Sequence, residues 1–485
     1  MSTSDNVVDR PSGTAEVGRR AALDRAHQIA VEFLRTLPER PVGPGASFGD
    51  LVAALGGPMP ENPEEAALVV NALARAVEPG LVGSAGPRYF GFVIGGNVPA
   101  ALAADWLTST WDQNAALNIA SPAAAAVEAV VADWVKDLLG LPGEAGVGFV
   151  TGCQMANFSG LLAGRHAALA QAGWDVEKLG LQGAPEVHVV IGEEAHATIL
   201  SALRFLGLGE ARARRVPADA QGRMIPEALK ATLAPLSGPI LVAAQAGNVS
   251  TGAFDPFEKI AAIAHARGAW LHVDGAFGLW AACDPSRRHL LQGVERADSW
   301  ATDAHKWLNV PYDSGIVIVK DPAHLNAALA KNAAYLIRSE GEARDNHDFT
   351  PESSRRARGF ALWAALRSLG RSGVRDLVSR CCTLAARMAE RLQAGGVAVL
   401  NDVVLNQVLV RFTPSQGGDA DAFTRKVVAQ IQAGGVTWAS GTKRRGTEAL
   451  RISVSNWSTT EDDIDRSAEA ILDACREVEN TLIMR

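Results

Sequence analysis

Short apolar runs alternate with amphipathic stretches through the middle of the chain, and this alternation constrains the fold more than any other feature. The amphipathic stretches, such as 159–173 and 256–268, are long enough to form helices. Strands that alternate with helices predict an α/β fold, in which helices cover both faces of a mainly parallel sheet. The buried strands are expected at 147–150, 186–191, 240–245, 270–274, 299–302 and 315–319.

The 485 residues are enough for more than one domain, and the chain divides into three expected regions. Residues 1–84 form an N-terminal arm with helices, 85–358 form the large α/β domain, and 359–485 form a small C-terminal α/β domain. In the small domain we expect helices at 359–370, 374–394 and 461–482 and strands at 408–412 and 449–455.

The N-terminal region itself is expected to be only partly ordered. Residues 1–20 are polar and predict disorder, whereas the patterns at 21–37 and 64–78 predict helices. The stretch 38–63 is rich in Pro and Gly, which favours an irregular connection between the two helices.

Composition excludes several classes of partner and location. The chain has 46 Lys and Arg against 53 Asp and Glu, and its net charge of −7 lacks the basic excess of a nucleic-acid surface. It contains no run of about eighteen apolar residues, so no membrane span is expected. Residues 1–20 lack the apolar core of a secretory signal. The five cysteines show no CxxC spacing, so we expect no metal site and a reducing cytoplasm.

Two segments carry the strongest chemical signal, HVDGAFG (272–278) and DAHKWL (303–308). Asp274 ends one expected strand and Lys306 follows the next. Taken singly, these residues could be a helix cap and a surface lysine. Ligands of open α/β sheets bind outside the carboxyl ends of the strands, so the two side chains are expected at one site. The pair suits pyridoxal 5′-phosphate (PLP), because the amine forms a Schiff base and the carboxylate keeps the ring nitrogen protonated.

These segments resemble those of the PLP-dependent amino-acid decarboxylases of group II, which include the aromatic-amino-acid and glutamate decarboxylases. The resemblance runs from about residue 80 to the C-terminus. It implies the PLP-dependent transferase fold type I (aspartate aminotransferase-like) with a sheet of seven-stranded type. It also implies PLP as cofactor, with Asp274 at the ring nitrogen and Lys306 as the Schiff-base lysine.

The segment TGCQMANFSGL (151–161) resembles the phosphate loop of this family. A strand leads through a small-residue turn into a helix, whose first backbone N–H groups attract an anion. Gly152, Cys153 and Gln154 are the expected phosphate contacts. Cys153 and Gln154 replace the small or hydroxyl residues usual there, although the Gln154 amide can still donate.

Further cofactor contacts are implied by the resemblance at the ends of other strands. His196, in EEAHATIL, is expected to stack on the cofactor ring. Asn248 is expected to reach either the phenolic oxygen of the cofactor or a substrate carboxylate. Ala276 would pack on the ring face, and His305 would support the phosphate or the lysine.

Two acids of these motifs are expected to have other roles. Asp255 precedes Pro256 and is expected to cap the helix that the proline starts. Asp303 stands where many relatives carry Asn, and as a phosphate ligand it would repel the phosphate unless it is protonated or paired.

Reaction type depends on the resemblance, since a sequence does not report which Cα bond is broken. In family decarboxylases a tyrosine on a loop protonates Cα after CO₂ leaves, and Tyr335 in NAAYLIRSEGEARDNH (332–347) occupies this place. We therefore expect decarboxylation of an L-amino acid to its amine. Transamination, aldehyde synthesis, C–C lysis and a non-catalytic PLP-binding role are the alternatives.

The substrate is the least constrained part of the prediction. Phe92, in GPRYFGFVIGGN (86–97), would line an apolar pocket that favours an aromatic or aliphatic side chain. Arg451 either binds a substrate carboxylate or braces the two domains. Relatives form homodimers with composite sites, so Trp111 to Asn114 either line the partner's site or pack at the interface.

Overall fold

The strands expected in the middle of the chain form one seven-stranded sheet. The computed structural model describes residues 13–329 and 344–483, so Tyr335 lies outside the described residues. The strand order is β1-β7-β6-β5-β4-β2-β3. The bounds are β1 Gly146–Val150, β2 His188–Gly192, β3 Arg214–Val216, β4 Ile240–Gln245, β5 Trp270–Asp274, β6 Ser299–Asp303 and β7 Gly315–Val319.

Pairing in this sheet is mainly parallel, as predicted. The strands β3, β2, β4, β5 and β6 pair in parallel, whereas β7 pairs antiparallel with both β6 and β1. Every residue of β1, β5, β6 and β7 is buried. The sheet is therefore covered on both faces, which explains why its strands are continuous apolar runs instead of alternating ones.

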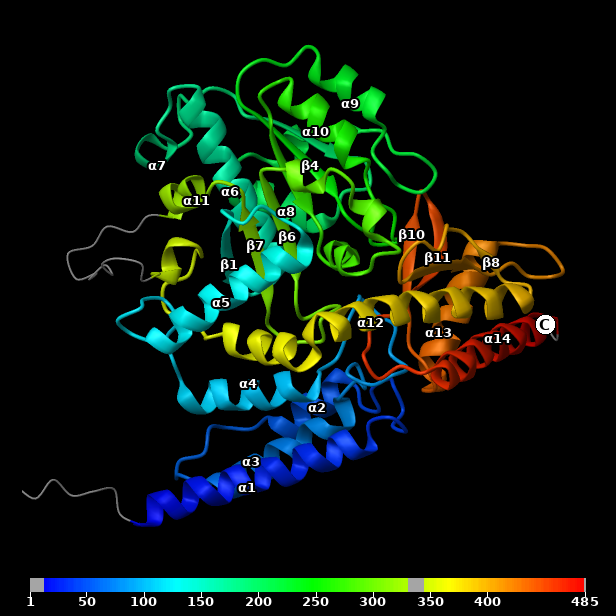
Figure 1. Cartoon of the computed structure of the whole chain (residues 1–485). Coiled ribbons are helices and arrows are strands. Elements are labelled where there is room, and N and C mark those ends of the chain that lie inside the picture. Colours follow the sequence, from blue (N-terminus) through cyan, green and yellow to red (C-terminus); the bar gives the residue numbers. More distant parts are fainter. Residues whose placement is uncertain (1–12, 330–343, 484–485) are drawn as a thin grey trace, which may run out of the picture.

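Helices surround this sheet and link its strands (Figure 1). Those that follow one another through the large domain are α5 Pro122–Leu139, α6 Cys153–Gln171, α7 Val176–Leu179, α8 Ala197–Phe205, α9 Pro226–Leu233, α10 Phe257–His265 and α11 Pro322–Leu329. Among these, α6 packs against β5, β6 and β7. Its first residue follows the end of β1, so the start of α6 lies at the edge of the sheet where β5 and β6 also end.

A second, antiparallel sheet forms in the C-terminal part with the order β10-β11-β9-β8. Its bounds are β8 Ala398–Val399, β9 Gln407–Arg411, β10 Ser440–Arg444 and β11 Thr447–Ser453, and its helices are α12 Gly359–Ala394, α13 Ala420–Gly434 and α14 Glu461–Ile483. The two helices expected at 359–394 form α12, with a kink at Gly370, where φ is 62°. The domain boundaries at 84 and 358 stay a prediction.

The N-terminal helices form a layer below α4 Pro99–Trp111 in Figure 1, made of α1 Gly13–Thr36, α2 Phe48–Leu55 and α3 Ala66–Val77. The prediction of disorder for 1–20 is wrong for residues 13–20, which belong to α1, and α1 packs along α3. The helix α2 was also missed. Ser47 and Asp50 form a capping box at its start, with Asp50 N donating to Ser47 Oγ at 3.2 Å. This Ser-x-x-Asp signal offsets the surrounding Pro and Gly.

The strands β3, β8 and β10 were not predicted either. Each lies at the edge of its sheet, and β3 and β10 contain charged residues that face solvent. Such strands lack the apolar run that identified the central strands. None of the helices in the described ranges has both the length and the apolar composition that crossing a bilayer requires.

Candidate functional site

Asp274 and Lys306 lie at the carboxyl edge of the sheet, where β5 and β6 end. Asp274 is 4% exposed, and its Oδ2 accepts a hydrogen bond from Asn157 Nδ2 at 3.0 Å. Its Oδ1 accepts from Ala276 N at 3.2 Å and from the Cys153 thiol at 3.5 Å. The structure thus brings the acid together with two residues of the expected cofactor set.

Asp303 links the lysine to the start of α6. Its Oδ2 lies 2.8 Å from Lys306 Nζ, and its Oδ1 accepts from the backbone N–H of Cys153 at 2.6 Å. Burial acts to lower the pKa of Lys306, but the Asp303 carboxylate, together with Cys153 and Asp274, holds that pKa above its usual value. Lys306 is therefore an ammonium at neutral pH when its partner is Asp303.

At the Gly152 turn, the backbone before α6 lies very close to the backbone of β7. A Cβ on Gly315 in β7 would meet the main-chain atoms of Gly152, and a Cβ on Gly152 would lie 3.0 Å from the His305 ring. The turn therefore places the N-terminus of α6 directly beside the lysine segment. This region combines an amine, a carboxylate, an imidazole and a helix start, which are the groups that the aldehyde, ring nitrogen, ring face and phosphate of PLP need.

Asp303 lies where the phosphate of PLP is expected to bind, at the start of α6. The Cys153 N–H already donates to a carboxylate, so a phosphate at the start of α6 would meet an acid there. Gln154 Nε2 donates to Thr198 O at 3.4 Å instead of facing an anion. The phosphate roles of Gly152, Cys153 and Gln154 stay predictions, and they require Asp303 to keep its pairing with Lys306, to be protonated or to be displaced.

Burial keeps the Cys153 thiol neutral. It raises the pKa of Cys153 well above its usual value, and the nearby Asp274 and Asp303 carboxylates raise it further. A neutral S–H can donate weakly to Asp274, whereas a thiolate could not. The cysteine therefore fits beside two acids despite its departure from the family pattern.

His196 begins α8 and is oriented by that helix. Its Nδ1 lies 2.8 Å from Thr198 Oγ1 and accepts from Thr198 N at 3.3 Å. Burial lowers the pKa of His196, while the charge of Asp274 opposes the shift and that of Lys306 adds to it. Its ring is accordingly neutral at pH 7, and its stacking role stays a prediction.

His305 is held beside Lys306 by three contacts. Its Nδ1 accepts from Ser314 N at 3.1 Å, and its Nε2 lies 3.5 Å from Asp303 Oδ1. The Tyr312 ring packs against it with centroids 4.4 Å apart. Burial lowers the pKa of His305, so the ring is neutral and its remaining N–H faces Asp303.

The prediction that Asp255 caps a helix is wrong. No side-chain cap is present at the start of α10, and the Asp255 carboxylate accepts from Met224 N at 2.6 Å and Gln245 N at 2.7 Å. These bonds join β4 to the segment before α9. Burial raises the pKa of Asp255 to about 6, although both backbone donors act to lower it.

Asn248 forms a turn after β4. Its Oδ1 accepts from Ser250 N and Thr251 N at 2.9 and 3.1 Å, and its Nδ2 donates to Glu194 Oε2 at 3.2 Å. The expected contact with the cofactor or substrate stays a prediction, since these bonds already occupy its oxygen.

Arg451 is buried without an acid partner in the described part of the chain. It is 9% exposed, its Nη1 donates to Val249 O at 3.4 Å, and its Nε has no hydrogen-bond partner there. Burial lowers its pKa, and its charge acts on His196. A buried guanidinium this weakly bonded can accept an anionic ligand.

Phe92 lies further out, on the segment that packs on the lysine. A Cβ on Gly95 would collide with the carbonyl oxygen of Lys306, so this segment runs directly against the lysine backbone. Phe92 is 57% exposed, has a φ of 52°, and its ring lies 5.5 Å from that of Trp438. Its role as a substrate wall stays a prediction.

Sequence reasoning missed three residues that support this site. Asn157 contacts Asp274, and His272 contacts Asn157 with 2.9 Å between His272 Nε2 and Asn157 Oδ1. Glu194 bonds Asn248 and also Arg444 of β10, with two oxygen–nitrogen distances of 3.0 Å. A signal for His272 existed, because it precedes Asp274 by two residues and so shares its face of the strand.

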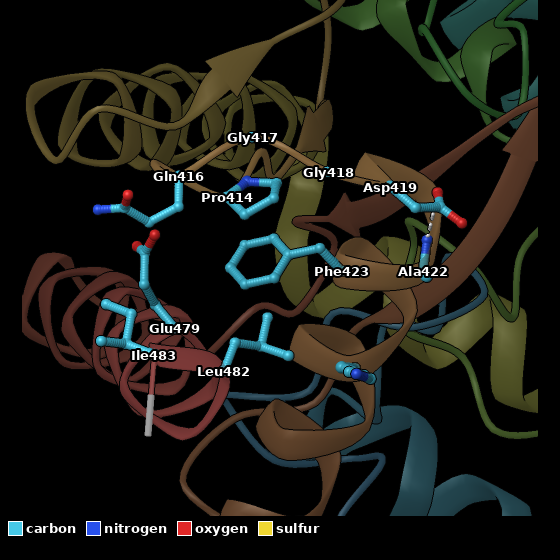
Figure 2. A pocket seen from close by; sticks show the side chains of 11 residues that line it. Pro414, Gln416, Gly417, Gly418, Asp419, Ala422, Phe423, Glu479, Leu482 and Ile483 are labelled. Atoms are coloured by element: carbon cyan, nitrogen blue, oxygen red, sulfur yellow. Dashed lines mark hydrogen bonds between the residues drawn. The ribbon is translucent and has the colours of Figure 1, made fainter. Parts of the chain in front are cut away.

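A pocket of about 340 Å³ lies elsewhere, between α13 and the end of α14 (Figure 2). Phe423, Leu482 and Pro414 form its apolar part. Its acids have structural roles, since Asp419 caps α13 and Glu479 accepts from Ser415 N at 2.7 Å. None of the residues lining it belongs to the Asp274–Lys306 site, so we place the functional site at the edge of the large sheet.

Known proteins resemble the chain over most of its length. A family model described as "Pyridoxal-dependent decarboxylase conserved domain" matches residues 49–412. Tryptophan decarboxylase 1 of Oryza sativa subsp. japonica is 29% identical over 490 residues, covering 95% of this chain and 94% of that protein. L-2,4-diaminobutyrate decarboxylase of Rhizobium meliloti (strain 1021) is 31% identical over 388 residues, covering 78% and 76%. The crystal structure of Oryza sativa TDC with PLP and tryptamine has a TM-score of 0.89 at 27% identity, covering 98% of this chain and 100% of that chain.

Proposed function

The chain belongs to the pyridoxal-dependent decarboxylase family, and we propose that it removes the α-carboxylate of an aromatic L-amino acid as CO₂ and releases the amine. It is a PLP-dependent carboxy-lyase of the fold type I class, as expected from the sequence. The observation that carries the proposal is the placement of Asp274 and Lys306 at one edge of the sheet.

Lys306 and Asp274 would hold the cofactor. The Lys306 amine, once the ammonium has lost a proton, would attach the cofactor's aldehyde covalently, and the Asp274 carboxylate would keep a proton on the ring nitrogen. When bound, PLP supplies an electron sink for the pair that remains when the bond between Cα and the carboxylate breaks. Asp303 holds the Lys306 amine, and His305 in turn contacts Asp303.

His196 and Arg451 would orient the reacting groups. The neutral His196 ring, fixed by Thr198, offers a flat face for stacking on the cofactor. Arg451 offers a buried positive charge to the substrate carboxylate. Phe92, on the segment beside Lys306, and Trp438, whose ring lies 5.5 Å from that of Phe92, supply aromatic surface, which supports an aromatic substrate over an acidic one. Tyr335 is the proposed proton donor to Cα.

The proposal is tested by a screen of the twenty amino acids with the purified enzyme and PLP. We expect CO₂ and amine in equal amounts from tryptophan, tyrosine or phenylalanine. A keto acid would indicate transamination, and an aldehyde with hydrogen peroxide would indicate aldehyde synthesis; either would overturn the proposal. Turnover of L-2,4-diaminobutyrate alone would overturn the substrate class while leaving the decarboxylase chemistry intact.

We expect Arg451→Met to raise KM about ten- to hundredfold and to change kcat less, because a charge-assisted hydrogen bond to the substrate is lost. The exposed Arg425, paired with Glu448 on the same sheet, provides the matched control Arg425→Met. If Arg451 only braces the two domains, the substitution will lower the unfolding temperature and leave KM unchanged.

We also propose a homodimer whose interface includes the N-terminal helices. The helices α2 and α3 contain no buried residue, and α3 exposes Leu68, Val69 and Leu73 at 63%, 48% and 55%. A groove of about 550 Å³ between α1 and α4 is lined by Leu34, Leu102 and Trp106, among others. Apolar surface of this extent on amphipathic helices is typical of a face that another subunit covers.

The dimer predicts a solution mass of about twice 50.9 kDa. The double variant Leu68→Glu/Leu73→Glu should give a folded monomer, because both side chains already face solvent in the single chain. Leu179→Glu on α7, a leucine 58% exposed, should keep the dimer mass. Light scattering distinguishes these outcomes, and a wild-type monomer would contradict the proposal.

A reducing cytoplasm is the proposed location. All five cysteines are free, and Cys381 and Cys382 are buried side by side in α12 without a bond between them. Proteins of oxidising compartments commonly join their cysteines in disulfides, whereas the five cysteines of this chain are free thiols.

A further inference from the structure

A chain of buried hydrogen bonds leads away from Asp274 between α6 and one face of the sheet. Asn157 Nδ2 lies 3.0 Å from Asp274 Oδ2, and Asn157 Oδ1 lies 2.9 Å from His272 Nε2. His272 Nδ1 lies 2.8 Å from Ser299 Oγ, and Ser299 Oγ accepts from Trp270 Nε1 at 2.9 Å. Asn157, His272 and Ser299 are fully buried, with 0% exposure.

The chemistry of the groups determines the direction of every bond. An ionised Asp274 only accepts, so Asn157 must turn its NH₂ toward the carboxylate and its oxygen toward His272. His272 Nε2 must then carry the hydrogen, which leaves Nδ1 as an acceptor for the Ser299 hydroxyl. Trp270 Nε1 only donates. All four bonds therefore donate in the same sense, toward Asp274.

Two competing contacts do not break this sequence. Ser299 Oγ also lies 3.4 Å from Gly160 O, but the hydroxyl has one hydrogen and the 2.8 Å contact with His272 is shorter. Asn157 Nδ2 also donates to Thr198 Oγ1 at 3.1 Å, which uses its second hydrogen and fixes the same orientation of the amide.

Small residues of α6 leave room for the ring side chains that β5 directs toward that helix. Trp270, His272 and Asp274 occupy every second position of β5, so their side chains lie on the same face of the strand. A Cβ on Gly160 would lie 2.7 Å from the His272 ring, and a Cβ on Gly164 would lie 2.7 Å from the Trp270 ring. Two glycines one turn apart in α6 therefore provide the space that the two rings occupy.

The relay also stays neutral except at its end. Burial lowers the pKa of His272 to about 4, against the opposing effect of Asp274, so the imidazole is uncharged at pH 7. A neutral imidazole donates from one nitrogen and accepts at the other, as the relay needs. A protonated ring would have no acceptor for Ser299.

We propose that Trp270, Ser299, His272 and Asn157 form a one-directional donor relay that stabilises the negative charge of Asp274. His272 and Ser299 are positioning residues, because they act on the carboxylate only through Asn157. Hydrogen bonds aligned head to tail polarise one another, so each bond strengthens the next toward the acid. The inference rests on the proposed function, in which Asp274 keeps a proton on the ring nitrogen of PLP.

The test loads the enzyme with PLP labelled with ¹⁵N in the ring and measures the nitrogen chemical shift, which differs widely between the protonated and the neutral ring. We expect a protonated ring in the wild type. His272→Leu should move the signal toward the neutral position and raise the dissociation constant of PLP about three- to tenfold, the range expected for a weakened bond to a charged group. His272→Gln can donate and accept, so it should keep the wild-type signal.

Two further variants keep the test decisive if His272→Leu folds poorly. Ser299→Ala removes the link between Trp270 and His272 and should shift the signal in the same direction by less. Thr424→Val is the control, because Thr424 is buried in the small domain with two bonds to the Phe412 backbone. It should lower the unfolding temperature without moving the signal.

The outcomes separate this inference from the proposed function. A wild type that fails to bind PLP would contradict the proposed function. A wild type with a protonated ring, together with unchanged signals in both His272→Leu and Ser299→Ala, would contradict the relay alone.

Discussion

Replacing Lys306 with alanine is expected to reduce decarboxylation at least about 10³- to 10⁴-fold, the upper range for the loss of one acid–base group. The loss is large because Lys306 is the only residue proposed to attach the cofactor covalently. PLP should still bind, since Asp274 and His196 remain, but borohydride should no longer fix it to the chain. Amine formation and the mass of the reduced peptide 303–308 measure the two effects.

Lys320, which follows β7, provides the matched control. It is a partly exposed lysine at the end of β7, and among the described residues Asp303 has its lysine ion pair with Lys306. Lys320→Ala should keep full activity and labelling. Residual activity of Lys306→Ala near that of the wild type would exclude the covalent role and, with it, the proposed mechanism.

The substitution Arg355→Met is expected to destabilise the fold by about 3–5 kcal/mol, the usual effect of removing one partner of a buried ion pair. Arg355 Nη2 donates to Glu128 Oε1 and Oε2 at 2.7 and 2.6 Å, and each side chain is 1% exposed. Arg355 also donates to Phe149 O at 3.2 Å. Without it, the buried Glu128 carboxylate of α5 would lose its hydrogen-bonded cation, and the electrostatic attraction of Arg344 would remain.

An exposed pair between α5 and α12 is the control for this stability prediction. Arg371 of α12 bonds Asp137 of α5, with 62% and 67% of the side chains exposed. Arg371→Met should change the free energy of unfolding by less than about 1 kcal/mol, because surface ion pairs contribute little. Urea unfolding measures both variants. The double variant Arg355→Met/Glu128→Leu should recover part of the loss, and equal stability of the two single variants would contradict the argument.

Local patterns identified the central elements of the fold. The strands β4, β5 and β7 begin and end at the predicted residues, since each is a short apolar run bounded by polar or turn residues. Burial on both faces makes such runs recognisable without knowledge of their neighbours. The polar edge strands β3 and β10 carried no such signal, and they formed because a neighbouring strand offered hydrogen bonds.

Local patterns did not predict which hydrogen-bond partners the polar side chains near the site would have. Asp255 followed a sound local rule for a helix cap, yet its carboxylate bonds Met224 N and Gln245 N instead. A cap satisfies donors of one helix, whereas the folded chain presented two other buried N–H groups that needed an acceptor. Which donor a carboxylate satisfies depends on what the fold buries around it.

The sequence by itself determined the α/β class, the strand end at Asp274, the place of Lys306 just after the next strand, and the family, because these depend on residue type and on spacing along a few neighbouring residues. Only the tertiary structure decided that Asp303 bonds Cys153 across 150 positions, that Asn157 bonds Asp274 across 117, and that Arg355 neutralises Glu128 across 227. Such contacts depend on the direction of a side chain after packing, which hydrophobic periodicity does not encode. The one-way order of the Asp274 relay follows from these contacts and from the charge of the acid at its end.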